Sequence, residues 1–206
     1  MEDLASLNSL HFDILKEIGN IGAGNALTAL AKLLGKKVDM KVPAVNLVEF
    51  KDIADFLGGP EQRVIGILIQ IKGDLNGIMM FLLKDDSAFY LIKAIMMDLA
   101  PEEVSDGFSE LELSALKEIG NILASSYLGS LAELMHLNIV PSVPFLAIDM
   151  ANAVLSVPAI EFGKVADRAL FIESVFISEM NDISGYFLLI PDLPSFERIL
   201  SALGVG

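Results

Sequence analysis

The hydrophobic and polar positions of the chain predict two long helices, over about residues 7–34 and 109–136. In the first, Asp13, Glu17 and Asn20 stand at positions i, i+4 and i+7, so at about 100° per residue they form one polar stripe on one face. The apolar residues that point roughly the other way are Ile14, Ile18, Ile21, Gly22 and Ala29. Such a helix buries its apolar side and presents the stripe to solvent or to a partner.

The second helix repeats this stripe. Ser114, Glu118 and Asn121 have the same spacing, and the sequence Leu-Lys-Glu-Ile-Gly-Asn-Ile begins at Leu15 and again, 101 residues later, at Leu116. A lone Glu-x-x-Asn is usually part of a solvated face, where packing constrains the sequence least. Because the two halves otherwise match only in pattern, identity of the polar positions favours a function for the stripe.

The remaining pattern predicts the same order of elements in each half. In the first half we expect strands over 42–50, 63–72 and 77–84 and a closing helix over 85–98. In the second half we expect strands over 145–149, 168–179 and 185–190 and a closing helix over 194–203, with about seven extra residues within 151–165. The predicted fold is α+β: a pseudo-two-fold duplicated unit with a mostly antiparallel central sheet, covered on one face by the two long helices. Residues 1–206 then form one domain of two repeats, at about 7–100 and 109–206.

Composition and charge narrow the classes of function. The net charge of −14 and the lack of a basic stripe argue against nucleic-acid binding. Without cysteine the chain has no disulfides, thiolate nucleophiles or zinc–thiolate sites, and two histidines leave no evident metal centre. No apolar run approaches the roughly 20 residues of a membrane span, and Glu2 and Asp3 stand where an export signal would carry lysines. We therefore expect a cytoplasmic protein without membrane insertion.

The stripe offers a carboxylate and an amide rather than a nucleophile or a metal cage. An asparagine is no proton acceptor at neutral pH, but its amide can hold a water by donating and accepting hydrogen bonds. Orienting a water for in-line attack on phosphorus is a known task of amides where metal and electrophile are already assembled. Such a surface suits a substrate that brings its own magnesium and phosphoryl group, and the carboxylate would pair with a cation of that substrate.

The doubled Asp/Ser-x-x-x-Glu-x-x-Asn pattern resembles the CheC, CheX and FliY family of chemotaxis phosphatases, over essentially the whole chain. Two motif copies without an appended switch domain fit the CheC-type members better than the single-motif CheX type. The resemblance implies that Asn20 and Asn121 position water at the aspartyl phosphate of CheY, while Glu17 and Glu118 pair with a CheY lysine. It also implies that Mg²⁺ is held by CheY and that this chain binds no cofactor or metal.

The resemblance further implies that CheD, the receptor deamidase, binds the protein and modulates its activity. We place that contact at 145–157, with Phe145, Asp149 and Asn152 as candidates, although a buried strand and helix would have the same apolar composition. Asp13 and Ser114 are expected in a supporting role. A monomer is expected, because the duplication supplies a two-fold pairing internally. The alternatives are a non-catalytic module that binds CheY or CheD and a flagellar-switch component.

Overall fold

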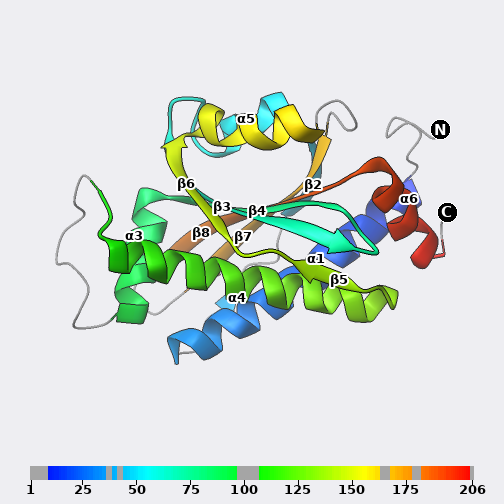
Figure 1. Ribbon diagram of the computed structural model, residues 1–206, viewed down its shortest axis with the longest axis horizontal. Coiled ribbons are helices and arrows are strands. Elements are labelled where there is room, and N and C mark those ends of the chain that lie inside the picture. The colour runs from blue at the N-terminus through cyan, green and yellow to red at the C-terminus, as the bar shows by residue number, and fades with distance from the viewer. Residues whose placement is uncertain are drawn as a thin grey trace.

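The computed structural model describes residues 9–35, 39–40, 44–96, 107–162, 168–177 and 182–204. In this part of the chain, two long helices lie below an eight-stranded sheet and two shorter helices lie above it (Figure 1). The long helices are α1 (Ser9–Leu34) and α4 (Glu110–Met135), and the shorter ones are α2 (Phe50–Phe56) and α5 (Ala151–Phe162). At opposite ends of the α1 and α4 layer lie α3 (Asp85–Met96) and α6 (Leu193–Ala202).

The two halves of the chain share one sheet. Its strands are β1 (Asp39–Met40), β2 (Ala44–Glu49), β3 (Arg63–Gly73), β4 (Gly77–Lys84), β5 (Ile139–Pro141), β6 (Phe145–Met150), β7 (Arg168–Ile177) and β8 (Asp182–Pro191). Their order is β1-β7-β8-β4-β3-β5, with β2 also beside β7 and β6 beside β3, and each pair among the described residues is antiparallel. The central pair joins the halves, with Met80 of β4 opposite Leu188 of β8. The predicted antiparallel sheet is confirmed.

Strand β4 shows why helices cover both faces of this sheet. Met79 and Phe81 belong to the core shared with α1 and α4, whereas Met80 and Leu82 belong to a second core with α2 and α5. All four side chains are buried. The expected cover by the two long helices is confirmed for one face, but the prediction left out the cover of the other. A continuous apolar run in an antiparallel strand fits burial on both faces, because one solvated face would give alternation.

The ends of the long helices follow from local chemistry. The predicted capping box opens α4: the Glu112 carboxylate accepts a hydrogen bond from the Ser109 N–H at 2.7 Å, and Ser109 Oγ accepts one from the Glu112 N–H at 3.4 Å. Helix α1 ends before Gly35, whose φ of +61° is a left-handed conformation that glycine adopts at low cost. The predicted helix ends at 34 and 109 are therefore confirmed.

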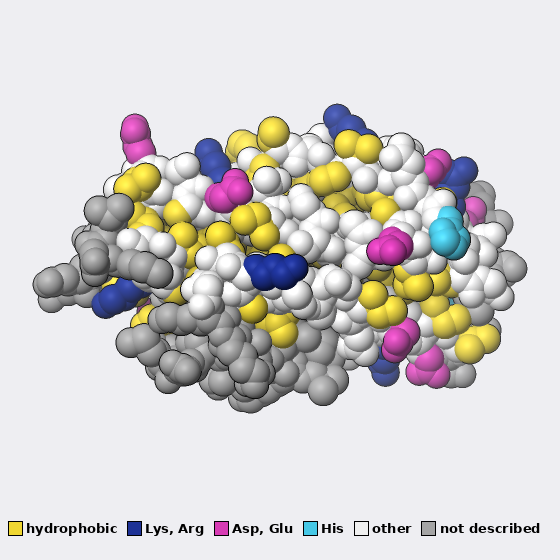
Figure 2. Space-filling view, turned by 90° about the horizontal axis from the view of Figure 1, so that it is seen from below, with side chains coloured by type: hydrophobic (Ala, Val, Ile, Leu, Met, Phe, Trp, Pro, Cys, Tyr) yellow, Lys and Arg dark blue, Asp and Glu magenta, His cyan; other side chains and the backbone are white. Residues whose placement is uncertain are grey.

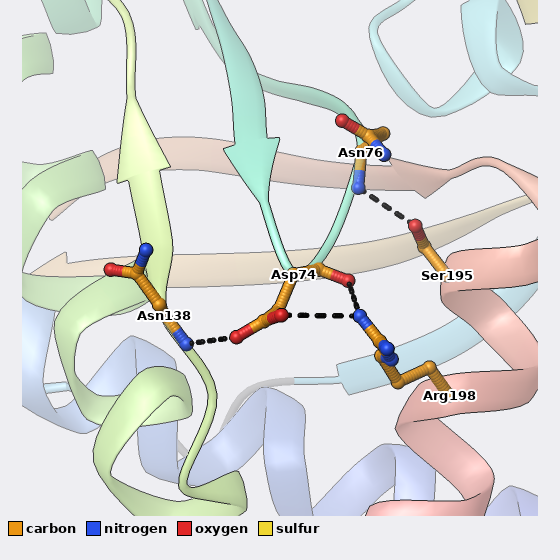
Figure 3. A network of polar contacts seen from close by, with 5 residues as sticks. All are labelled: Asp74, Asn76, Asn138, Ser195 and Arg198. Carbon is orange, nitrogen blue, oxygen red and sulfur yellow. Dashed lines mark hydrogen bonds and ion pairs between the residues drawn. The ribbon is translucent and has the colours of Figure 1, made fainter.

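A polar network ties the β3–β4 turn of the first half to the second half (Figure 3). The Asp74 carboxylate accepts hydrogen bonds from the Asn138 N–H at 2.8 Å and from Arg198 Nη1 at 3.2 Å. Beside it, the Asn76 N–H donates to Ser195 Oγ at 2.7 Å. These contacts attach the turn to the chain after α4 and to α6, and so brace one end of the helical layer.

The second half is longer than the first where the sequence predicted extra residues. Helix α5 has 12 residues and its counterpart α2 has seven. The two short strands β1 and β5 were not predicted, whereas the two hairpins and closing helices were. The parts of the predicted elements at 7–8, 42–43, 97–98, 163–165 and 178–179 lie outside the described residues. Within the described part, no helix is long and apolar enough to cross a membrane.

Candidate functional site

The two polar stripes lie at opposite ends of the helical layer. Helices α1 and α4 run in opposite directions (Figure 1), and each stripe occupies the N-terminal half of its helix. Exposure is the same in both copies: the first two side chains are exposed and the asparagine is partly buried. These residues are Asp13, Glu17 and Asn20 in α1, and Ser114, Glu118 and Asn121 in α4. The structure thus brings together each predicted trio and separates the two trios.

The side chains of both stripes make no polar contact with other described side chains. Within the described residues, none of the six forms a side-chain hydrogen bond or an ion pair. The amide oxygen of Asn20 is buried, yet it has no hydrogen-bond partner in that part of the chain. Buried polar atoms are nearly always paired, so an orphaned acceptor is a place for a water or a ligand. The Asn20 amide oxygen therefore has an unfilled place for one hydrogen-bond donor.

The inner side of each helix is fixed by packing. Leu15 and Ile18 flank Glu17 in the sequence and are buried, as are Leu116 and Ile119 around Glu118. Gly120 lies against the sheet, because a Cβ atom there would stand 2.4 Å from Cγ2 of Ile67. Helix α4 therefore approaches strand β3 more closely beside Asn121 than a larger residue would allow. Each stripe is presented by a helix that is tightly packed on its other side.

An open groove of about 580 Å³ runs between α1 and α4. Its lining consists of Asn25, Thr28, Ala29, Lys32 and Leu33 from α1 and Ile122, Ser126, Ser130 and Glu133 from α4. The sequence predicted Ala29 on the buried side, but it is partly exposed here and lines this groove. Figure 2 shows this face from outside: charged side chains stand apart among hydrophobic and uncharged polar ones.

The site has the means to orient a molecule but few means to react with it. Among the described residues no three His, Cys, Asp or Glu side chains lie close enough to hold a metal ion. What each stripe offers is one carboxylate for a cation and one amide for a water or a polar hydrogen.

The three candidates for a second contact surface belong to β6 and to the start of α5. Phe145 and Asp149 are on β6, Asn152 is in the first turn of α5, and all three are exposed. Phe145 exposes 65% of its surface and Ile160 of α5 exposes 72%. The segment also supplies buried residues, among them Val154, so part of its apolar composition serves the core.

Sequence reasoning missed the contact that joins the two helices. Tyr127 of α4 is fully buried, and its ring lies against Gly22 of α1. The only signals in the sequence were a glycine inside a helix, which lowers helix propensity, and a tyrosine among apolar positions. Neither says which residue meets which, because the contact spans 105 positions of the chain.

An α+β fold with a glutamate and an asparagine on the outer face of each of two long helices can be compared with proteins of known family. The sequence pattern of the CheC-like family matches residues 10–47 and 111–148. The Bacillus subtilis protein named CheY-P phosphatase CheC is 39% identical over 198 residues, which are 94% of each chain. This chain belongs to the CheC-like family.

Solved structures show the same fold at lower identity. Thermotoga maritima FliY superimposes with a TM-score of 0.74 at 21% identity, over 96% of this chain and 97% of that one. The FliM middle domain from H. pylori has a TM-score of 0.65 at 14% identity, over 95% and 99%. At these identities the likeness concerns the fold alone, and one fold can carry several functions.

Proposed function

We propose that this protein is a phosphatase that hydrolyses the aspartyl phosphate of the response regulator CheY, at two sites of one design. The observation that carries the proposal is the pair of uncommitted Glu and Asn side chains, presented twice on the fold of a family whose Bacillus subtilis relative is named a CheY-P phosphatase. The buried, unpartnered oxygen of Asn20 supports a water-binding role.

In the proposed reaction the asparagine amide orients a water in line with the bond between phosphorus and the aspartyl oxygen. The water oxygen bonds to phosphorus, the bond to the aspartyl oxygen breaks with its electron pair, and the water proton passes to the phosphate or to solvent. Free carboxylate and inorganic phosphate are the products. Asn20 and Asn121 contribute positioning, which suits a reaction whose electrophile is already activated by the metal ion of the regulator.

The carboxylates of Glu17 and Glu118 have a separate proposed role. Each lies one helical turn before its asparagine and is exposed without an internal partner among the described residues. We propose that each forms an ion pair with a lysine of CheY and so fixes the distance between the amide and the phosphoryl group. The Mg²⁺ ion would be held by CheY. Asp13 and Ser114 lie one turn further out and would support the docked partner.

We also propose that CheD binds the surface formed by β6 and α5 and modulates the activity. Support comes from the exposed apolar side chains Phe145, Val157 and Ile160 next to the polar Asp149 and Asn152, since exposed apolar patches with a polar rim often mark interaction sites. A monomer is proposed as the active form, because the pairing of β4 with β8 already joins the two halves.

The CheD surface is tested by one charge-introducing variant. Phe145→Asp should weaken CheD binding at least tenfold in calorimetric titration, because it places a carboxylate in the apolar patch. Leu111→Asp is the matched control, since Leu111 is 58% exposed but belongs to α4 on the other side of the sheet. Equal affinities for the two variants would show that CheD binds elsewhere.

The phosphatase activity is tested by the lifetime of phosphate on a purified regulator of the CheY type with Mg²⁺. Wild type should shorten this lifetime. Asn20→Ala and Asn121→Ala should each lose the part of the phosphatase activity that one site supplies, and the double variant should lose nearly all of the activity. Asn25→Ala is the control: it lies on α1 outside the stripe, and its Nδ2 donates to the Ile21 carbonyl at 3.0 Å. An unchanged lifetime despite binding would make the protein a non-catalytic binding module.

A further inference from the structure

Three aromatic rings form a column from the middle of the sheet to the helical layer. Phe81 of β4 stacks on Phe187 of β8, with ring centroids 4.7 Å apart and planes at 28°. Phe187 in turn stacks on Tyr127 of α4 at 5.6 Å and 27°. Strands β4 and β8 are the central pair of the sheet, and all three rings are buried. The column is therefore anchored in the buried centre of the sheet.

The column ends on the backbone of α1, beside the first site. A Cβ atom at Gly22 would lie 2.4, 2.6 and 2.7 Å from three carbons of the Tyr127 ring, a separation that real side chains do not show. Only glycine leaves room for the ring at this position. Gly22 is two residues after Asn20, within one turn of the same helix. The ring thus sets how closely that turn of α1 approaches α4 and the sheet.

The Tyr127 hydroxyl forms no hydrogen bond within the described part of the chain. It is fully buried. Burial raises the pKa of Tyr127, so the hydroxyl stays protonated and uncharged. What this residue contributes to the contact is the shape of its ring.

The second site is supported differently. With the offset of 101 residues between the halves, Gly22 corresponds to Leu123 and Tyr127 corresponds to Ala26. Both counterparts are fully buried in the same core. Around the crossing of the helices, the glycine on α1 and the tyrosine on α4 thus correspond, by the repeat, to a leucine on α4 and an alanine on α1. The two pairs of side chains have similar total volumes. The larger side chain is at the second position of the Gly22 and Tyr127 pair, but at the first position of the Leu123 and Ala26 pair.

We propose that Tyr127 is a positioning residue for the Asn20 site, although it belongs to the helix that carries Asn121. This inference rests on the proposed phosphatase function and adds that the two sites, alike in their polar residues, depend on different side chains for their geometry. With a smaller side chain at position 127, the turn of α1 that carries Asn20 can change its position relative to α4. Displacements of about 1 Å can cost up to roughly a hundredfold in rate, because the reacting groups lose their alignment.

The kinetic test isolates one site at a time. Tyr127→Leu is combined with Asn121→Ala, so that only the Asn20 site is intact. In a second protein it is combined with Asn20→Ala, so that only the Asn121 site is intact. We expect kcat on phosphorylated CheY to fall about tenfold through Asn20 and to stay within twofold through Asn121. Tyr127→Phe keeps the ring and should keep both rates. Gly22→Leu with Tyr127→Ala, which copies the Leu123 and Ala26 pair, should restore the rate through Asn20.

A second measurement does not depend on activity. The chain has no cysteine, so Lys16→Cys and Lys117→Cys introduce unique sites for spin labels on exposed positions of α1 and α4. The label distance should shift with Tyr127→Leu and remain that of the wild type with Tyr127→Phe. If wild type hydrolyses nothing, the proposed function fails and this distance still decides the positioning role. Equal losses of rate through both asparagines, or an unmoved label distance, would overturn the inference.

Discussion

Two glycines of α1 should respond in opposite directions to replacement by alanine. A Cβ atom at Gly24 would meet nothing within 4 Å, whereas one at Gly22 would stand 2.4 Å from the ring of Tyr127. Alanine in place of an exposed glycine inside a helix stabilises a protein by about 0.5–1 kcal/mol, because the unfolded chain loses conformational freedom. Gly24→Ala should therefore raise the free energy of unfolding by that amount.

Gly22→Ala brings the same gain in helix propensity, but it adds a methyl group to a filled core. Overpacking of this kind costs about 1–3 kcal/mol. Since the propensity gain is common to both variants, their difference reports the packing alone, and Gly22→Ala should be less stable than Gly24→Ala by about 1–3 kcal/mol.

Equilibrium unfolding in urea, followed by circular dichroism, measures both effects. Gly129→Ala of α4 is the matched control, because a Cβ atom there also meets nothing within 4 Å, and it should behave like Gly24→Ala. The m-value should be the same in all variants if the denatured state is unaffected. Equal stabilities of Gly22→Ala and Gly24→Ala would refute the tight contact between α1 and Tyr127.

Further predictions concern the hydroxyl, the network and the carboxylates. Tyr127→Phe should raise stability by about 1 kcal/mol in the same assay, because it removes a buried hydroxyl without a partner among the described residues. Asp74→Ala and Arg198→Ala should each cost about 1 kcal/mol, because each removes two hydrogen bonds of the network. Glu17→Gln and Glu118→Gln should each raise the CheY-P concentration for half-maximal rate through their own site about fivefold with kcat retained, and this effect should shrink in high salt.

The fold was predictable from the sequence where periodicity and duplication both apply. The helical stripe at 13–20 follows from 3.6 residues per turn, and its copy at 114–121 indicated which other segments should correspond. The cover of the second face escaped prediction because α2 has seven residues, too few for a helical period to stand out. Strands β1 and β5, of two and three residues, are shorter still.

The polar face of each long helix was predictable from the sequence, but the way the two helices pack against each other was not. Spacing along one helix placed Glu17 and Asn20 on one face, and the structure confirms that placement. The contact between Gly22 and Tyr127 depends on how two helices cross, which no local pattern encodes. The catalytic roles of the asparagines and glutamates, and the CheD surface, stay predictions.

The amides of Asn20 and Asn121 are proposed to accelerate hydrolysis rather than merely to hold the regulator. The most direct measurement is the rate of phosphate loss from CheY-P at saturating concentrations of the variant with both Asn20→Ala and Asn121→Ala, together with its affinity for the regulator. We expect an affinity within about threefold of wild type, since most single neutral side chains of an interface contribute little to binding, and a rate equal to that of the regulator alone. A rate close to that of wild type in the saturated complex would contradict the claim.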